Sequence, residues 1–493
     1  MYGDSFNKVI NDDLVRTLDP LIDDGTLYLG YPVLSTADSR VQVDALLVSR
    51  DRGIVAFQYA PAVPGGEEEW AEVIQDQDRL FAVVEGHLKR HDSLRRGRGL
   101  AFEPQTVTLF PAPATPPGSP DGKYLELAEI AEWLQQLEGF EQDFYRVVRS
   151  ATERVANIKP LKKRSGVTRE GSRGAIMRQI EKGIANLDRW QKKAAIETPD
   201  GPQRIRGLAG SGKTVVLALK AAYLHAQHPE WTIAVTYYSR SLSQQVESLV
   251  TRFAFEHSYE PPDPERLRIL HTWGGSGRGG LYTAMARAAG APVRDFQYAS
   301  ATYGMDNAFL GVCRELLEFT DGVDVAPLFD AVLIDEAQDL PIEFFRLVYR
   351  FTKHPKRIVW AYDELQRLSE SAMPSTLELF GTDLAGQAVV NIDNRANEAR
   401  KDIVLEVCYR NTPWALATAH AIGFGIYRPG GIVQHFDDYE LWGQIGYDTV
   451  HGSLSPGSEV TLRRATSSYP SFFTELLDPA DAVVLQSFDT EVA

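Results

Sequence analysis

The stretch Gly207-Leu-Ala-Gly-Ser-Gly-Lys213-Thr214 decides the fold that we predict for this 493-residue chain. It fits the pattern G-x-x-x-x-G-K-[ST], whose glycines let backbone N–H groups close around phosphates. The residues from Arg204 to Gly207 predict a short strand, and residues 215–224 predict a helix. A strand, a loop and a helix in this order are the context that the motif requires. The contacts to phosphate are assigned to Gly207, Ala209, Gly210, Ser211, Gly212, Lys213 and Thr214.

A second acidic element, Val332-Leu-Ile-Asp335-Glu336-Ala-Gln-Asp339, follows about 120 residues later. An apolar strand that ends in adjacent carboxylates is what phosphoryl transfer needs. Asp335 and the Thr214 hydroxyl are expected to bind Mg²⁺, while Glu336 orients and deprotonates the attacking water. Lys213 neutralises the β- and γ-phosphate charge. The two elements together predict a protein that binds ATP with Mg²⁺ and hydrolyses it.

Composition limits the class of protein. The length predicts about three domains, and 44% apolar with 24% charged residues is an ordinary globular composition. No run of eighteen uncharged apolar residues occurs, so no membrane-spanning helix is expected, and the N-terminus lacks the pattern of a signal peptide. Only Cys313 and Cys408 are present, which favours a reducing, cytoplasmic location. The net charge of −16 is compatible with nucleic-acid binding only through a local basic groove.

The first 150 residues are expected to form an α/β unit. Residues 40–49 and 54–60 predict two strands joined by a turn, and 106–110 a further strand. Helices are expected at 67–91 and 125–149. Residues 151–200 then form a basic, helical connector.

From residue 201 strands alternate with helices, the pattern of a parallel sheet covered by helices on its faces. The strands are expected at 232–236, 268–271, 331–334 and 357–361. Residues 275–325 interrupt the alternation and are interpreted as a helical insertion. A strand at 403–407 is expected to open a second α/β unit that extends over 401–493.

The acidic element resembles motif II of superfamily 1 helicases of the UvrD/PcrA/Rep type, and other stretches match that family in the same order. Trp190-Gln191 resembles the Q motif, Thr236-Tyr-Tyr-Ser-Arg240 motif Ia, and Leu270-His271-Thr272-Trp273 motif Ib. Asp363-Glu-Leu-Gln366 resembles motif III, and Cys408-Tyr409-Arg410-Asn411 motif IV. The resemblance covers about residues 187–412. It implies a RecA-like ATPase domain at 201–400 with the inserted helices, and a partial second RecA-like domain after it.

The resemblance also implies roles for individual residues. Gln191 and Tyr409 would hold the adenine, while Gln366 and Arg410 would sense the γ-phosphate, Arg410 reaching it from the second unit. Contacts to single-stranded DNA are implied for Tyr237, Tyr238, Arg240, His271, Thr272 and Trp273. For the aromatic residues, core packing at a strand end is an open alternative.

The sequence departs from the family in two places. Between Asn411 and Ala493 it lacks the two late helicase motifs, so we expect a fragment of a longer helicase or one half of a split one, completed by a partner polypeptide. The N-terminal hairpin resembles nuclease-related domains of restriction-endonuclease-like fold, but the catalytic acids and lysine would fall on Asp44, Gln58 and Ala60. A degenerate nuclease domain is therefore expected, and an unrelated accessory domain is the alternative.

The expected function is an ATP-dependent DNA helicase or translocase, 3′-to-5′ by resemblance, that acts on single-stranded or partly duplex DNA, as in DNA repair. The alternative is a nucleotide-gated DNA-binding or scaffold subunit that does not unwind by itself. A third interpretation, an active metal nuclease, predicts Mg²⁺-dependent nicking that Asp44→Ala removes.

Overall fold

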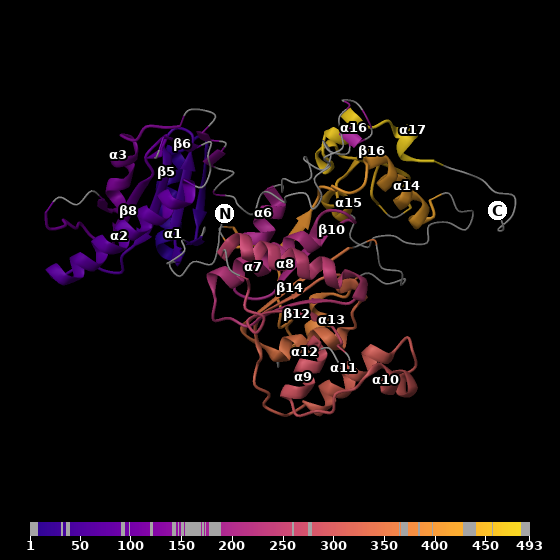
Figure 1. Ribbon diagram of the computed structural model, residues 1–493. Helices are drawn as coiled ribbons and strands as arrows, with labels where there is room; N and C mark the ends of the chain where they lie inside the picture. The colour runs from indigo at the N-terminus through magenta and orange to yellow at the C-terminus, as the bar shows by residue number, and fades with distance from the viewer. Residues whose placement is uncertain are drawn as a thin grey trace.

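The structure of the protein is a computed structural model (Figure 1). It describes residues 8–30, 33–35, 40–89, 94–97, 99–118, 122–140, 144–145, 147–148, 152, 169, 172, 174–176, 189–258, 261–274, 279–363, 365, 373–382, 385–396, 398–426, 440–455 and 457–484. Across these ranges the chain is a mixed α/β protein with two principal sheets, one of five strands and one of six. Most of the basic connector expected at 151–200 lies outside the described residues; its last part, 189–200, is described and contains a helix at Arg189–Ile196.

The N-terminal unit is built on the five-stranded sheet, in the order β1-β4-β5-β8-β9. Its strands are β1 (Gly25–Leu29), β4 (Ala45–Ser49), β5 (Gly53–Tyr59), β8 (Gln105–Phe110) and β9 (Lys123–Glu126). The first three pair antiparallel, and β5, β8 and β9 pair parallel. The predicted hairpin is confirmed, and Gly53, with φ of 74°, makes its tight turn. Residues 40–42 form a separate short strand, β3 (Arg40–Gln42), paired with β2 (Val33–Ser35).

Helices cover both faces of this sheet because its buried side chains alternate between two clusters. Leu47, Val55 and Phe57 pack with α1 (Lys8–Leu18) and α3 (Ile130–Leu134). Leu46, Ile54 and Ala56 pack with α2 (Glu67–Leu88). The single helix expected at 125–149 is wrong. Residues 123–126 are the edge strand β9 because they pair with β8, so tertiary pairing overrides local helix preference there.

The six-stranded sheet has the order β12-β11-β13-β14-β10-β15, and every pair in it is parallel. Its strands are β10 (Gln203–Gly207), β11 (Ile233–Tyr237), β12 (Leu267–His271), β13 (Phe329–Ile334), β14 (Thr352–Tyr362) and β15 (Asp402–Leu405). The parallel sheet predicted from residue 201 is thus confirmed. Because the strands are parallel, their carboxyl ends meet along one edge, where α/β proteins bind ligands.

Alternate residues of these strands face two different helical layers. Val235, Leu333 and Val359 pack with one layer, whereas Val332 and Trp360 pack with the other. The first layer consists of α6 (Arg189–Ile196), α7 (Lys213–Gln227) and α8 (Ser243–Ser258). The second contains α12 (Ile342–Phe351) and α13 (Thr376–Phe380), together with the inserted helices. Burial on both faces explains why the central strands β11 and β13 are apolar along most of their length.

The helical insertion predicted between the strands is also present. Helices α9 (Leu281–Ala288), α10 (Phe296–Tyr303) and α11 (Ala308–Phe319) lie between β12 and β13 in the sequence. Buried residues of α9 and α11, such as Met285 and Val312, extend the second cluster. In Figure 1 these helices form the lower end of the molecule.

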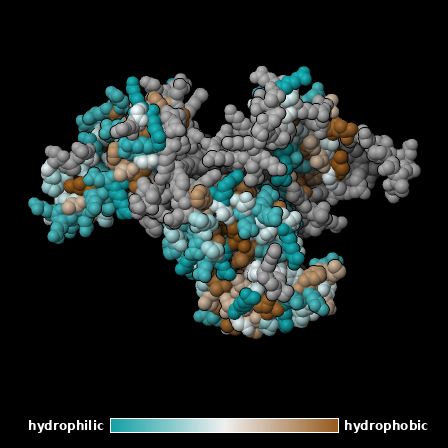
Figure 2. All heavy atoms as spheres, viewed as in Figure 1, coloured by the Kyte–Doolittle hydropathy of each residue, from teal (hydrophilic) through white to brown (hydrophobic). Residues whose placement is uncertain are grey.

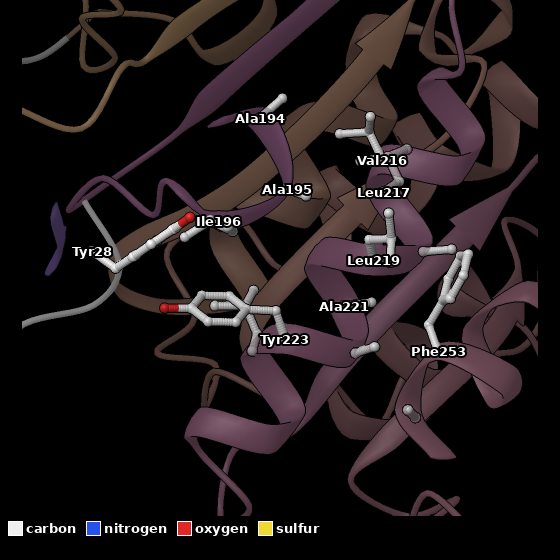
Figure 3. Packing of buried hydrophobic residues seen from close by; sticks show 14 of the residues in the cluster. Tyr28, Ala194, Ala195, Ile196, Val216, Leu217, Leu219, Ala221, Tyr223 and Phe253 are labelled. Atoms are coloured by element: carbon white, nitrogen blue, oxygen red, sulfur yellow. The ribbon is translucent and has the colours of Figure 1, made fainter. Parts of the chain in front are cut away.

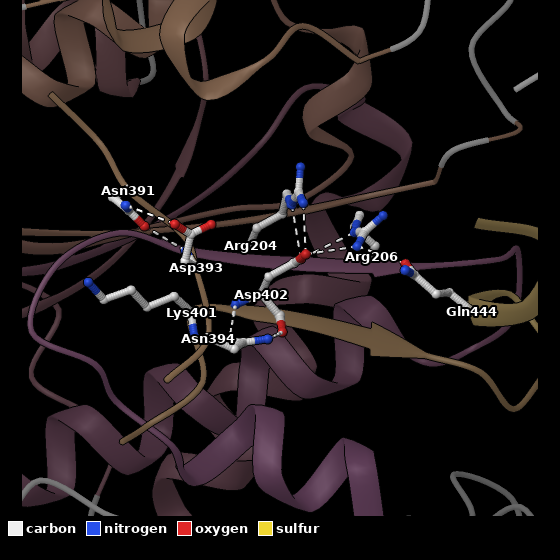
Figure 4. Close-up of polar contacts among 8 residues, drawn as sticks. All are labelled: Arg204, Arg206, Asn391, Asp393, Asn394, Lys401, Asp402 and Gln444. Carbon is white, nitrogen blue, oxygen red and sulfur yellow. Dashed lines mark hydrogen bonds and ion pairs between the residues drawn. The ribbon is translucent and has the colours of Figure 1, made fainter. Parts of the chain in front are cut away.

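The strand at 402–405 corrects the expected domain boundary. β15 pairs parallel with β10, so it is the edge strand of the six-stranded sheet and does not begin another sheet. Its Asp402 carboxylate accepts hydrogen bonds from Arg204 (2.7 Å) and Arg206 (2.8 Å) of β10 (Figure 4). Burial alone would raise the pKa of Asp402, but the two guanidinium groups outweigh it and hold that pKa below its usual value. These ion pairs join β15 to β10, and the sequence around Asp402 does not reveal them.

After β15 the described chain forms a smaller helical region with one hairpin. It contains α14 (Pro413–Phe424), α15 (Glu440–Gln444), β16 (Tyr447–Gly452), β17 (Val460–Arg464), α16 (Phe472–Leu476) and α17 (Pro479–Ala482). β16 and β17 pair antiparallel as a sheet of their own. Of the described residues after 405, none adds a parallel strand, so the partial second RecA-like domain stays a proposal.

The N-terminal unit packs on the helix that follows the glycine-rich loop. The carbonyl of Gly30 accepts hydrogen bonds from the Tyr223 hydroxyl (3.2 Å) and the Gln227 amide (2.9 Å) of α7. Tyr28 is fully buried and lies in the same cluster as Tyr223 and Ile196 (Figure 3). The two units therefore share a continuous apolar core at this contact.

No helix among the described residues is long and apolar enough to cross a membrane. Where Figure 2 colours the visible face it is mostly hydrophilic, and apolar residues show near the centre, at the upper right and around the inserted helices at the bottom.

Candidate nucleotide and nucleic-acid site

The glycine-rich loop connects the end of β10 to the first turn of α7, as its sequence predicts. Gly210 and Gly212 have φ of 86° and 90°, a left-handed conformation that favours glycine. A Cβ on Gly212 would lie 2.5 Å from the amide nitrogen of Gln191, and one on Gly210 would collide with Cβ of Arg410. The loop is therefore a tight backbone cradle, and its shape fits a phosphate chain.

Lys213 is buried beneath this loop, with 6% of its surface exposed. Its Nζ donates to the carbonyls of Gly207 (2.8 Å) and Leu208 (3.1 Å). The same ammonium lies 3.6 Å from Oδ2 of Asp363, at the end of β14. Lys213 is thus held by its own loop and by one carboxylate.

The two predicted motifs meet at Thr214 and Asp335. The Thr214 hydroxyl donates to Oδ2 of Asp335 over 2.8 Å, and Oδ1 of Asp335 has no hydrogen-bond partner among the described residues. Burial, followed by the charge of Glu336, raises the pKa of Asp335 to about 6, against the lowering effect of Thr214 and Lys213. A buried carboxylate oxygen without a partner, beside a threonine hydroxyl, fits the ligand set that Mg²⁺ takes in nucleotide sites.

Glu336 follows Asp335 at the carboxyl end of β13 in a strained backbone conformation. Its φ of 50° is left-handed, which is uncommon for a residue other than glycine. The Gln338 amide donates to Oε2 of Glu336 over 2.7 Å, and the Gln338 carbonyl oxygen accepts from the backbone N–H of Asp363 at 3.4 Å. Gln338 therefore ties Glu336 to the end of β14, a role that the sequence did not suggest.

The segment after β15 packs directly on the glycine-rich loop. The backbone N–H of Tyr409 donates to the Gly210 carbonyl (2.9 Å), while Cys408 Sγ (3.1 Å) and the Asn411 amide (3.3 Å) approach the Ala209 carbonyl. Arg410 is exposed beside Gly210. Arg410 follows β15, and β15 pairs with the strand that precedes the loop, so the expectation that Arg410 comes from a separate lobe is corrected.

Of the three other residues expected to contact the nucleotide, two lie at the loop. Gln191 lies at the loop, but its amide donates to the Ser211 carbonyl over 2.7 Å and is buried. Tyr409 is half-buried beside the same loop. Gln366 lies outside the described residues. The assignments of adenine contacts to Gln191 and Tyr409 stay predictions.

Aromatic side chains line the carboxyl ends of β11 and β12. The Tyr238 ring is 37% exposed and stacks on His271 at 6.5 Å between ring centroids. Phe309 of α11 lies 6.0 Å from Tyr238 and 5.2 Å from Trp273. Phe296 of α10, 52% exposed, continues the row 5.9 Å beyond Trp273. We call these five residues the aromatic row, and the sequence pattern did not reveal its two phenylalanines.

Burial corrects two of the nucleic-acid candidates. Tyr237 is 6% exposed and its hydroxyl donates to Ser243, so its ring belongs to the core. Thr272 is fully buried. Arg240 is exposed, as a phosphate contact requires. Burial lowers the pKa of His271, an effect that Arg240 reinforces and the Tyr238 backbone opposes, which favours the neutral ring.

The row and the loop are connected through the sheet. The backbone N–H of Asp335 donates to the carbonyl of Thr236 over 2.9 Å, two residues before Tyr238. β13 pairs with β11, so Asp335 is hydrogen-bonded to the strand that is followed by Tyr238.

The N-terminal unit carries the three positions at which a degenerate nuclease site was expected. Oδ2 of Asp44 accepts from the backbone N–H of Tyr59 at 2.8 Å, while burial raises the Asp44 pKa more than this bond lowers it. The Gln58 side-chain oxygen is buried without a described partner, and Ala60 is 6% exposed. Asp44 thus has a structural contact in the hairpin. Across the described ranges no group of three or more His, Cys, Asp or Glu residues could hold a metal ion.

Comparison with known proteins adds no family assignment. The sequence matches no known protein family, and no curated protein is significantly similar to it. What the fold and site define is an α/β protein with a six-stranded parallel sheet.

Proposed function

We propose that this protein is an ATPase that couples hydrolysis to movement along single-stranded DNA, a helicase or translocase of the superfamily 1 type. The observation that carries the proposal is the 2.8 Å contact between Thr214 and Asp335, made by two motifs that are remote in the sequence. It lies at the carboxyl edge of a parallel sheet, beneath a glycine-rich cradle.

The chain's own residues support a division of labour at the phosphates. The loop N–H groups and Lys213 would bind the phosphate chain, and Glu336, held by Gln338, would orient water and accept its proton. Arg410, exposed beside Gly210, is placed to reach negative charge that develops there. Thr214 and Asp335 would hold Mg²⁺, which would supply positive charge to the phosphates.

The aromatic row supports single-stranded DNA as the polymer. Bases stack on exposed aromatic rings independently of their sequence, and Tyr238 and Phe296 present such rings. Arg240, exposed next to Tyr238, would add a phosphate contact. The hydrogen bond between Asp335 and Thr236 would couple the bound nucleotide to the affinity of the aromatic row for single-stranded DNA.

One observation favours a second function, a nucleotide-gated DNA-binding or scaffold subunit. β15 belongs to the six-stranded sheet, so Arg410 does not reach the loop from another lobe. The one sheet among the described residues after 405 is the β16–β17 hairpin. Without a moving second lobe the chain would bind but not translocate. A partner polypeptide could supply that lobe.

Measurement of ATPase activity with and without single-stranded DNA separates the two functions. Stimulation of turnover by an oligothymidine, absent in Lys213→Ala, is the result expected for the motor. ATP binding without DNA-stimulated turnover would leave the scaffold function. Absence of ATP binding by the intact chain would overturn both.

A further inference from the structure

Asp363 is a buried acid at the end of β14 whose charge the proposed chemistry does not use. It is 1% exposed, and its Oδ1 accepts from the backbone N–H of Leu365 at 3.0 Å. Its Oδ2 has no hydrogen-bond partner among the described residues but lies 3.6 Å from Nζ of Lys213. This oxygen points at the ammonium that a phosphate chain would need.

Lys213 has few other sources of negative charge. Two of its contacts are the neutral carbonyls of Gly207 and Leu208. Asp335 is also near enough to feel Lys213, but one of its oxygens already accepts the Thr214 hydroxyl. Asp363 is therefore the carboxylate that pairs with Lys213 in the structure.

A triphosphate must compete with this pair. When the ammonium turns to the phosphates, the Asp363 carboxylate remains buried with a weaker counter-charge, and a buried carboxylate without a partner is costly. The energy of the Lys213–Asp363 contact therefore opposes nucleotide binding. The attraction between Asp363 and Lys213 is restored when the phosphates leave, and it therefore favours release of the product.

We propose that Asp363 is a positioning residue that holds Lys213 in the nucleotide-free site, weakens the binding of ADP and ATP, and speeds product release. The inference rests on the proposed function, since it needs a nucleotide in the glycine-rich cradle. The mechanism predicts a specific kinetic pattern for Asp363→Asn. Without the Lys213–Asp363 contact, ATP binds more tightly and ADP leaves more slowly. KM for ATP and kcat therefore fall together.

Asparagine is the suitable replacement because it preserves the rest of the network. Its side-chain oxygen can still accept from Leu365, and its backbone N–H still donates to Gln338. Asp330→Asn is a matched control on the neighbouring strand β13. It removes an ion pair with Lys353 without contacting the loop.

The test measures ADP·Mg²⁺ and AMP binding to the full chain by titration calorimetry, and ATP turnover, for the wild type and both variants. We expect ADP to bind Asp363→Asn about tenfold more tightly, the scale of one charge-assisted contact. AMP, which lacks the β-phosphate, should bind equally to all three proteins. Unchanged or weaker ADP binding by Asp363→Asn, with a wild type that binds ADP, overturns the inference alone. A wild type that binds no ADP overturns the proposed function as well.

A second measurement covers the case in which Asp363→Asn folds poorly. Denaturant midpoints are compared for Lys213→Met, Asp363→Asn and the double variant without nucleotide. Lys213→Met leaves Asp363 buried without the cation that it faces in the structure, so the double variant should be more stable than Lys213→Met. A double variant with the same or a lower midpoint contradicts the pairing.

Discussion

Thr214 Oγ1 and Asp335 Oδ2 lie 2.8 Å apart, although 121 residues separate them in the sequence. Four parallel strands whose carboxyl ends share one edge bring together the glycine-rich loop, Asp335, Asp363 and the segment that carries Arg410. This geometry makes the following predictions specific.

Glu336→Gln should reduce kcat for ATP at least about 100-fold, because an amide cannot accept the proton of the attacking water. ATP binding should persist, since glutamine keeps the shape of the side chain and an oxygen that can accept from Gln338. Turnover and ATP binding would be measured on the same preparation. Glu343→Gln, which alters a carboxylate paired with Arg314, is the control. Equal turnover in Glu336→Gln and the wild type would remove Glu336 from the chemistry.

Gly210→Ala should weaken nucleotide binding and stability more than Gly386→Ala. Both glycines have a left-handed backbone, with φ of 86° and 76°, so both substitutions carry a similar strain. Only the Gly210 Cβ would collide with Arg410, whereas the Gly386 Cβ meets nothing within 4 Å. We expect an extra loss of about 2 kcal/mol in the free energy of unfolding. Equal losses in chemical denaturation would show that the Arg410 segment does not pack on the loop.

Asp402→Asn should lower stability by about 2 kcal/mol near neutral pH, because it leaves Arg204 and Arg206 without their shared carboxylate. The folded-state pKa of Asp402 is held low, so the stabilisation is present above its unfolded pKa and is lost as acid protonates the folded carboxylate. Denaturation from neutral to acid pH measures this difference. Asp393→Asn, whose carboxylate contacts only an exposed asparagine, serves as the control. A flat difference across that range would argue against the pair.

His420 should make the region after β15 sensitive to acid. Its Nδ1 lies 2.6 Å from the Tyr447 hydroxyl, and burial, assisted by the charge of Arg464, lowers the His420 pKa to about 4. Above pH 6.5 the ring is neutral in both states, and no stability is lost. Between pH 6.5 and 4 only the unfolded state gains the proton, so stability should fall by about 3 kcal/mol. His420→Gln should lack this fall. A parallel pH profile for wild type and variant would contradict the assignment.

Tyr238→Ala and Phe296→Ala should each weaken binding of a labelled oligothymidine about tenfold, because each removes one exposed stacking surface. Phe319→Ala is the matched control, since Phe319 is a 47% exposed phenylalanine of the inserted helices outside the aromatic row. Fluorescence anisotropy at fixed salt measures the affinities. A comparable loss in Phe319→Ala would show that the effect is not specific to the row.

The sequence predicted the elements whose causes are local. The glycines of the loop, the apolar run before Asp335 and the helices between β12 and β13 were all recognised, because backbone conformation and hydrophobic period are set by near neighbours. The helix expected at 125–149 failed for the opposite reason. Strand β9 forms because it pairs with β8, and β8 lies too far away in the sequence to be included in a local pattern.

For the candidate site, the sequence by itself determined the residue types: a glycine-rich loop, adjacent carboxylates and aromatic residues at strand ends. Only the tertiary structure decided their partners. It brought the segment that carries Arg410 against the loop and buried Tyr237. It also added Phe296 to the aromatic row and set Asp363 against Lys213. These outcomes depend on contacts between remote segments, whose free energy is gained only when the whole sheet is assembled.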